Sequence, residues 1–374
     1  MIVKGPLINL ENRDIKSILL IQLGDIGDLV LTLPAIETLR ANFPKAHLAV
    51  AVREKAAGLL QDHHAVDQVL PVDRHKHGAK GLWHQLKLLV SLIFRRFDLS
   101  IELRTGTRGA VLSAVSMAQI RIGRHGNDDR LRELCFTHIV KPASETGQYA
   151  AQHNLNILEP LNLNCVSPLI PALSIPNERF SAVTAKLKNL LPKPEKPILV
   201  VHPFSIWHYK ELTAQQYQYI FSHLAAAYDV NLVLTGSPDE RPRAQALIDS
   251  SRLPNVNMAG KTSIMEMACL LQLACLVISI DTSAVHIATA VQTPTVSIFG
   301  PSSTLNWAPR GDLHRVVTHS MSCIPCSKKG CDDTEKVPCL HGLAPELICD
   351  EIDTHIQKME SLLPGRNLMR HSPS

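Results

Sequence analysis

Residues 17–35 read SILLIQLGDIGDLVLTLPA, and this stretch decides the class of fold. An apolar run typical of a buried strand enters a glycine-containing loop, and a helical pattern follows in which Pro34 suits an early position. Loops of this kind commonly bind phosphate through backbone N–H groups. This one carries the carboxylates of Asp25 and Asp28, which would repel a phosphate. The stretch therefore predicts an α/β fold and leaves open what its loop binds.

The same alternation of apolar strands and helical patterns runs through both halves of the chain. Strands are expected at 17–23, 47–52, 67–72, 98–103, 197–203, 230–236, 275–281 and 293–300. Apolar strands separated by helices are typical of parallel sheets covered on both faces. We therefore expect two doubly wound, Rossmann-like domains facing a cleft, residues 1–185 and 198–374, with a Pro- and Lys-rich linker at 186–197.

Length and composition exclude several classes of protein. The 374 residues exceed one ordinary core, and a net charge of +4 permits an anionic substrate without indicating a general nucleic-acid binder. The N-terminus lacks the apolar segment of a signal peptide, and the apolar run at 86–94 is interrupted by Lys87 and too short to span a bilayer. We expect a cytoplasmic protein, with its nine cysteines present as thiols or metal ligands.

The most informative strand-end loop lies in ISIDTSAVHIATA, residues 278–290. The strand ends at Asp281, and Thr282 and Ser283 suit the N-terminal cap of the helix that follows. A helix N-terminus offers free N–H donors and about half a positive charge, which favours an anionic diphosphate. His286, one turn into the helix, would add a donor, although a histidine on an apolar helix is more often a core residue.

Two other strand-end loops carry charged residues of interest. Lys210 precedes Thr213, a helix-capping residue, so its ammonium group is placed to reach a bound anion; by itself such a lysine is more often a solvated side chain. Glu240 follows the strand at 230–236, where a carboxylate serves either as a helix charge or as a partner for ribose hydroxyls.

Taken together, these segments resemble glycosyltransferase family 9, the ADP-heptose:lipopolysaccharide heptosyltransferases. The similar elements are GDIGDLVLTLP, HP…K, LTGSPDE, DTSAVHIATAVQTPTVSIFGPSS and the C-terminal cysteine segment, in that order over residues 17–345. The resemblance implies a GT-B architecture, with the acceptor on the N-terminal domain and the nucleotide-sugar donor on the C-terminal one. It also implies sugar transfer with inversion and no cofactor or metal required for the chemistry.

The resemblance further implies roles for individual residues. The family's catalytic base is the aspartate after the second glycine, which here is Asp28, and Asp25 is left as a local structural charge. The donor is expected to contact Lys210, Glu240, Asp281, Thr282, Ser283, Ala284 and His286. The family usually has glycine where this chain has Ser283, so the donor sugar could differ. A carboxylate that takes the proton of an acceptor hydroxyl makes this oxygen a better nucleophile.

The acceptor that the resemblance implies is a lipid-linked anionic saccharide, so the acceptor side, in the N-terminal half, is expected to be basic. Gly27 permits close approach, and Arg104 and Arg108, in RTGTR directly after a strand, are the best candidates to bind it. Such an acceptor also predicts peripheral contact with the inner membrane. The segment GLWHQLKLLVSLIFRRF at 81–97 has suitable aromatic, aliphatic and arginine character, although an ordinary sheet-covering helix is the commoner structure for such a pattern.

Four cysteines gather in MSCIPCSKKGCDDTEKVPCL, residues 321–340. Cys323, Cys326, Cys331 and Cys339 match the count of a structural tetrathiolate zinc site, but their spacing is shorter than the usual two-pair pattern. Similar cysteines occur in the resembled family without a catalytic duty. A structural knot in the C-terminal domain is therefore the main expectation, and structural zinc the less favoured one.

Three hypotheses about function follow. The first is an inverting transferase that moves heptose from ADP-heptose to inner-core lipopolysaccharide, with Asp28 as general base and no nucleic-acid partner. The second keeps the fold and changes the nucleotide-sugar donor or the surface glycan. The third is a non-catalytic, zinc-stabilised module for anionic glycans or nucleic acid, suggested by the cysteines and by the basic run DRHKHGAK at 73–80. Steep weakening of binding with salt would favour the third.

Overall fold

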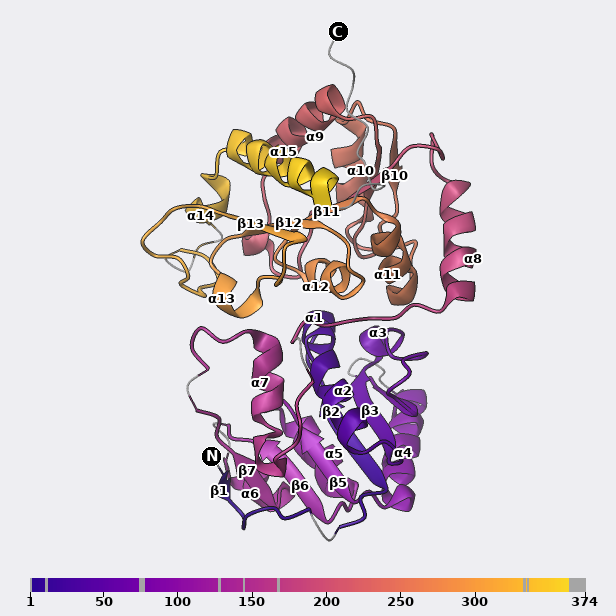
Figure 1. The fold of residues 1–374 in the computed structure, drawn as a ribbon, viewed down its shortest axis with the longest axis vertical. Coiled ribbons are helices and arrows are strands. Elements are labelled where there is room, and N and C mark those ends of the chain that lie inside the picture. The colour runs from indigo at the N-terminus through magenta and orange to yellow at the C-terminus, as the bar shows by residue number, and fades with distance from the viewer. Residues whose placement is uncertain are drawn as a thin grey trace. The chain divides into compact units, whose positions relative to one another are not determined.

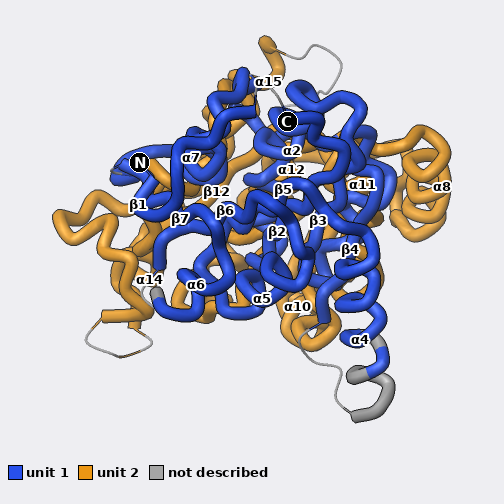
Figure 2. The backbone as a smooth tube through the Cα atoms, turned by 90° about the horizontal axis from the view of Figure 1, so that it is seen from below, with its two compact units in different colours: residues 1–173 blue, residues 174–374 orange. Residues whose placement is uncertain are grey.

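Each half of the chain is built on its own parallel sheet, as the ribbon of this computed structural model shows (Figure 1). The chain divides into two compact units, Met1–Leu173 and Ser174–Ser374 (Figure 2). The structure describes residues 2–10, 13–73, 78–126, 129–143, 145–166, 169–331, 334 and 336–362. The α/β class and the two-domain organisation expected from the sequence are therefore confirmed.

The sheet of the first unit has the strand order β1-β7-β6-β5-β2-β3-β4. Its strands are β1 (Ile2–Lys4), β2 (Ser17–Gln22), β3 (His47–Arg53), β4 (Gln68–Val72), β5 (Leu99–Glu102), β6 (Ile120–Arg124) and β7 (His138–Val140). Neighbours pair in parallel, except that β1 is antiparallel to β7. Residues 18–21 in the central strand β2 are fully buried, which explains why the apolar run there is unbroken.

Helices connect these strands. They are α1 (Ile26–Val30), α2 (Leu33–Asn42), α3 (Glu54–Ala57), α4 (Gly78–Arg95), α5 (Thr107–Val115), α6 (Asp129–Cys135), α7 (Ala150–Asn156) and the 3-10 helix η1 (Glu159–Leu161). Two short helices follow the first loop where the sequence pattern indicated one. Thr32 lies between them, and its hydroxyl donates to the backbone oxygen of Asp28 at 2.7 Å instead of capping α2.

The second unit contains a six-stranded sheet, entirely parallel, in the order β10-β9-β8-β11-β12-β13. Its strands are β8 (Ile198–His202), β9 (Asn231–Leu234), β10 (Asn255–Asn257), β11 (Leu276–Ile280), β12 (Thr295–Phe299) and β13 (His314–Thr318). Its helices are α8 (Asn177–Lys188), η2 (His208–Lys210), α9 (Ala214–Ala227), α10 (Arg241–Asp249), α11 (Ile264–Leu273), α12 (Ser283–Ala290), α13 (Thr304–Trp307), α14 (Pro338–His341) and α15 (Pro345–Leu362).

The boundary between the units differs from the expected linker at 186–197, because that segment belongs to the second unit. Helix α8 packs against α11, and Lys186 forms an ion pair with Glu266 at 2.7 Å. Leu187 and Leu191 are buried. The proline and lysine content marked a surface loop correctly, but the contacts of α8 with α11 tie the loop to the second unit. The division falls between Leu173 and Ser174.

A buried ion pair joins β5 to α6 in the first unit. Arg132 lies 2.6 Å from the carboxylate of Glu102, and both side chains are almost fully buried. Arg132 also donates to the backbone oxygen of Arg124 at 2.6 Å, and its guanidinium lies 4.9 Å from the ring centre of Phe136. Burial raises the pKa of Glu102 to about 7, against the opposing effect of Arg132. The pair therefore holds together elements that carry the loops at the carboxyl edge of the sheet.

Replacing Arg132 by methionine is expected to lower the free energy of unfolding by about 3–5 kcal/mol, because the buried carboxylate of Glu102 would lose its partner. Urea denaturation followed by circular dichroism measures the change. The matched control is Lys16→Met, which breaks the exposed ion pair with Asp14 and should cost less than about 1 kcal/mol. An Arg132→Met loss no larger than that of the control would contradict the importance of the pair.

Buried and partly buried histidines make stability depend on pH. Burial lowers the pKa of His63, His202 and His314 to about 4 in each case. Between about pH 6.5 and 4 the unfolded chain takes up protons that the folded chain does not. Stability should therefore fall on acidification, by at most about 1.4 kcal/mol per pH unit for each histidine. Glu102 has the opposite effect, because its pKa is raised in the folded state and its contribution to stability is lost as the pH rises. It is one group against three histidines.

Thermal denaturation between pH 7 and pH 4.5 tests this expectation. The midpoint should fall across the range, and it should fall less steeply in a His63→Asn variant, which removes one of the three groups. The amide oxygen of the asparagine can accept the Ala65 N–H bond that His63 Nδ1 accepts at 3.3 Å. A midpoint that stays constant or rises on acidification would contradict the assignment of neutral, buried histidines.

Candidate functional site

The loop after β2 holds the carboxylate of Asp28 in a defined position. Asp28 is the third residue of α1, and its Oδ2 accepts the backbone N–H of Asp25 at 2.8 Å. Its Oδ1 accepts a hydrogen bond from Arg104 at 2.9 Å, and the side chain stays 17% exposed. A Cβ on Gly24 would lie 2.4 Å from Oδ2, so glycine is needed for this carboxylate to fold back over the loop. Each oxygen accepts one bond and so keeps a lone pair for a further donor.

Asp25, the other acid of the loop, has different partners. Its Oδ1 lies 2.6 Å from Arg53 and 2.7 Å from Lys55, which stand at the end of β3 and in α3. Partial burial pulls the pKa of Asp25 upward, but Lys55 and Arg53 outweigh it and hold this pKa below its usual value. These contacts fit the local structural charge that the sequence analysis assigned to Asp25.

The residues predicted to bind the acceptor have different partners in the structure. Arg104 is half exposed and pairs with Asp28, and Gly27 is the residue beside Asp28 in α1. Arg108 instead donates to the backbone oxygen of Asp73 at 2.7 Å, so it is bound to the end of β4. Of the basic run at 73–80, residues 74–77 lie outside the described residues. The structure therefore brings Arg104 to the candidate base, and leaves Arg108 with a different partner.

In the second unit, Lys210 and Asp281 come together at neighbouring strands. Strands β8 and β11 are parallel neighbours, and the loops at their carboxyl ends carry these two residues. The ammonium Nζ of Lys210 lies 2.5 Å from Oδ2 of Asp281, and the carboxylate is largely buried. Burial, and then the charge of Asp281, raise the pKa of Tyr209. The pair places a partly exposed cation beside the start of α12.

Helix α12 begins as the sequence pattern predicted. Thr282 is its N-cap, and the threonine hydroxyl accepts the backbone N–H of Ala284 at 3.4 Å. Ser283 is the first helical residue and is partly exposed, whereas His286 is buried one turn further on. The helix start thus presents backbone at the carboxyl edge of the sheet, the position where α/β proteins bind anions.

Glu240 has a local partner. Its Oε2 accepts the backbone N–H of Ser237 at 2.6 Å, and it is the N-cap residue of α10. A Cβ on Gly236 would lie 2.9 Å from the same oxygen. This bond within the turn fits the role of a local charge at the helix start. Contact with ribose hydroxyls stays a prediction.

Two residues that the sequence analysis did not single out support the Lys210 loop. Glu211 is buried, and its carboxylate accepts the backbone N–H of Ser205 at 3.0 Å. It also forms an ion pair with Arg243, whose guanidinium lies 4.7 Å from the ring centre of Phe204. Arg243 lies 32 residues from Glu211 in the chain. No local signal marks such a pair, because only the fold brings the segment after η2 and helix α10 together.

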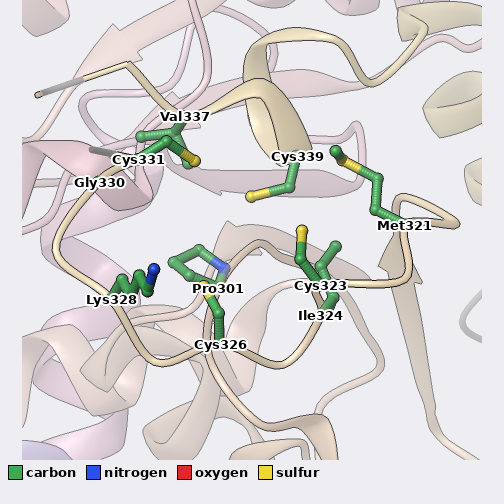
Figure 3. Close-up of a pocket in the computed structure, with 10 residues that line it drawn as sticks. All are labelled: Pro301, Met321, Cys323, Ile324, Cys326, Lys328, Gly330, Cys331, Val337 and Cys339. Carbon is green, nitrogen blue, oxygen red and sulfur yellow. The ribbon is translucent and has the colours of Figure 1, made fainter.

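The four clustered cysteines line one small pocket in the second unit (Figure 3). Burial, and then the neighbouring cysteines, raise the pKa of Cys339 to about 11. Within the described residues, the group of possible metal ligands with atoms within 4.8 Å of one another is Glu37, His63 and His64, so no three of the four sulfur atoms approach that closely. A tetrahedral zinc would hold them roughly 3.8 Å apart. Met321 and Ile324 pack against the core, which fits a structural knot; zinc stays a prediction for metal analysis.

The hydrogen bonds of His63 argue against a metal at the Glu37, His63 and His64 group. The backbone N–H of Ala65 donates to Nδ1 of His63, so the proton of the neutral ring is on Nε2. Nε2 faces the Oε1 of Glu37 at 3.6 Å. A metal would need the lone pair of that nitrogen, and the structure favours a His63–Glu37 contact instead.

Comparisons with known proteins agree with this architecture. The sequence profile of glycosyltransferase family 9 (heptosyltransferase) matches residues 85–336. Lipopolysaccharide heptosyltransferase 3 of Escherichia coli is 26% identical over 76% of this chain and 83% of its own length. Two solved structures share the fold. A family 9 glycosyltransferase from Veillonella parvula has a TM-score of 0.76 and 20% identity, with coverage of 92% of this chain and 98% of its own. ADP-heptose lps heptosyltransferase II of E. coli has a TM-score of 0.75 and 19% identity, with coverage of 92% and 99%.

These findings exclude the third hypothesis from the sequence, the non-catalytic binding module. Both units have the Rossmann-like sheets of the GT-B architecture, as in the two solved structures. The profile match covers well over half of the chain, which confirms the resemblance and makes this protein an enzyme, not a non-catalytic binding module. The chain belongs to glycosyltransferase family 9, the heptosyltransferase family.

Proposed function

We propose that this enzyme transfers a heptose from ADP-heptose to an inner-core lipopolysaccharide acceptor, with inversion and with Asp28 as general base. The names of its relatives support the donor and the acceptor: one is a lipopolysaccharide heptosyltransferase, and another is an ADP-heptose lps heptosyltransferase. The observation that carries the proposal is the carboxylate of Asp28, held by Asp25 and Arg104 with lone pairs left over.

In this mechanism the acceptor hydroxyl donates its hydrogen bond to Asp28. The hydroxyl oxygen attacks the anomeric carbon from the face opposite the leaving ADP, so one C–O bond forms as the other breaks and the configuration inverts. Asp28 takes the proton as the new bond forms, which avoids a positively charged oxygen. Arg104 holds the carboxylate in place at 2.9 Å and acts as a positioning residue.

The donor is assigned to the carboxyl edge of the second sheet. Negative charge grows on the diphosphate as the sugar leaves, and a cation and backbone N–H groups already in place stabilise that charge most in the transition state. Lys210 supplies the cation, and Ser283 supplies an N–H group at the helix start, with His286 behind it. The N–H of Ala284 donates to the Thr282 hydroxyl at 3.4 Å and can share this long bond with a phosphate oxygen. Lys210 is bound to Asp281 in this structure, so donor binding must let the ammonium share its hydrogen bonds with phosphate oxygens.

A transfer assay with ADP-heptose on lipopolysaccharide acceptors truncated at successive core sugars tests the proposal. A heptose should be added to one truncation and not to shorter ones, and NMR of the product should show the inverted anomeric configuration. Calorimetry with ADP and UDP tests the alternative of another nucleotide-sugar donor. Binding of UDP without binding of ADP would overturn the ADP-heptose assignment.

A further inference from the structure

Helix α4, in the first unit, has two apolar faces, and among its described side chains one face is packed and the other exposed. Leu88, Leu89 and Leu92 pack into the core of the first unit. A second set, between 41% and 81% exposed, consists of Trp83, Leu86, Val90, Ile93 and Phe94. At 100° per residue these five side chains fall within an arc of about 100°, opposite the leucines. Monomeric soluble proteins rarely expose so many large apolar side chains side by side.

The charged side chains along this stretch of the chain are all basic. Residues 74–97 contain six lysines and arginines and no aspartate or glutamate. In the described part, Lys87 borders the stripe, and Arg95 and Arg96 follow at the end of α4; all three are exposed. An apolar face flanked by cations is the pattern of helices that lie in the headgroup region of an anionic bilayer. The tube view places α4 at the edge of the first unit (Figure 2).

The other occupants fit this surface less well. A second copy of the chain would bring the same positive flank against itself, and like charges across a symmetric interface are repulsive. Insertion across the bilayer is also excluded for α4, because no helix in the described ranges is long and apolar enough to span a membrane. A helix that lies on the bilayer surface uses both the apolar side chains of the stripe and the positive charge beside them.

We propose that α4 docks the enzyme on the surface of a bilayer that contains anionic lipid. The stripe of Trp83, Leu86, Val90, Ile93 and Phe94 enters the headgroup region, and Lys87, Arg95 and Arg96 contact lipid phosphates. This inference deepens the proposed function, on which it rests for the need to reach a lipid-linked acceptor. Docking in this way brings the enzyme to the surface where such an acceptor lies.

Vesicle sedimentation with the full chain tests the docking. Vesicles of phosphatidylcholine with about one third phosphatidylglycerol should bind the protein, and pure phosphatidylcholine vesicles should bind it at least tenfold more weakly. The double variant Trp83→Ser/Phe94→Ser should lose at least tenfold in binding, and Lys87→Glu/Arg96→Glu should lose both binding and its dependence on salt. The matched control is Leu134→Ser, an 81% exposed leucine on α6 of the same unit, which should bind as the wild type does.

Several outcomes would overturn the inference. Equal binding of the Trp83→Ser/Phe94→Ser variant and the wild type would do so, as would equal binding to the two kinds of vesicle. Light scattering that shows a dimer converted to a monomer by the same variant, without vesicles, would assign the stripe to a second copy. Thermal denaturation should show the variants folded, since the changed side chains are exposed.

Transfer to a short, soluble acceptor separates the two proposals. The Trp83→Ser/Phe94→Ser variant should keep wild-type transfer to that acceptor and lose transfer to acceptor in vesicles. If the wild type binds anionic vesicles and transfers no heptose, the proposed function fails and the docking surface stands. If it transfers heptose and does not bind vesicles, the docking inference fails alone.

Discussion

Asp28→Asn should lower kcat for heptose transfer by about 10³-fold, the size of effect expected when a general base is removed. Asparagine has nearly the same shape, and its amide oxygen can still accept one of the two bonds that Asp28 accepts from Asp25 and Arg104. It cannot take a proton from the acceptor hydroxyl. Calorimetry should therefore give an ADP affinity within about threefold of the wild type, because the donor is assigned to the other unit.

Asp25→Asn is the matched control, since it removes a carboxylate three residues away in the same loop. Its ion pairs with Arg53 and Lys55 would be lost, which should reduce stability slightly and leave kcat within a few-fold of the wild type. Retention of more than about a tenth of wild-type kcat by Asp28→Asn would reject the base assignment.

Lys210→Met should lower kcat/KM by about 10²–10³-fold, the effect of removing one preorganised group that stabilises charge in a transition state. The same change weakens ADP binding, because the ammonium also contacts the ground-state diphosphate. Lys210→Arg should recover part of the activity, since it keeps the charge with a different geometry. Steady-state kinetics and calorimetry on the purified variants measure both effects.

The Lys210→Met variant also leaves Asp281 without its partner, and further variants separate this effect on stability from the loss of activity. Without Lys210 the largely buried carboxylate of Asp281 has lost its 2.5 Å partner, so some stability should be lost as well. The double variant Lys210→Met/Asp281→Asn removes the stranded charge, and it should regain stability without regaining activity. Lys358→Met breaks the exposed pair with Asp312 in the same unit and should change neither property. Recovery of activity together with stability would show that Lys210 acts only through folding.

Much of the fold could be predicted because its signals are local. The eight strands expected from apolar runs all occur, with ends that differ by one or two residues. The start of α12 was also predicted, since a strand that ends at Asp281 and a capping Thr282 are neighbours in the chain. The boundary was misplaced, because proline and lysine indicate a loop but do not tell which domain packs against it. The packing of α8 against α11 and the ion pair of Lys186 with Glu266 decided that.

The pairings around the candidate site could not be read from the sequence. Arg104 meets Asp28 over a separation of 76 residues, because β5 pairs with β2 and their loops therefore leave the sheet side by side. Lys210 meets Asp281 because β8 pairs with β11. The exposed stripe of α4 could not be predicted either, because the pattern at 81–97 does not tell which apolar residues the core covers.

The sequence by itself determined the alternation of strands and helices, the glycine loop that holds Asp28 and the helix start at Thr282. These features depend on burial periodicity and on capping, which act between residues close in the chain. Tertiary structure decided which charges meet, since strand order brings together side chains that no local rule relates. For that reason Asp28 was a candidate through the resemblance of its loop to the family's, and its bond to Arg104 came only with the folded sheet.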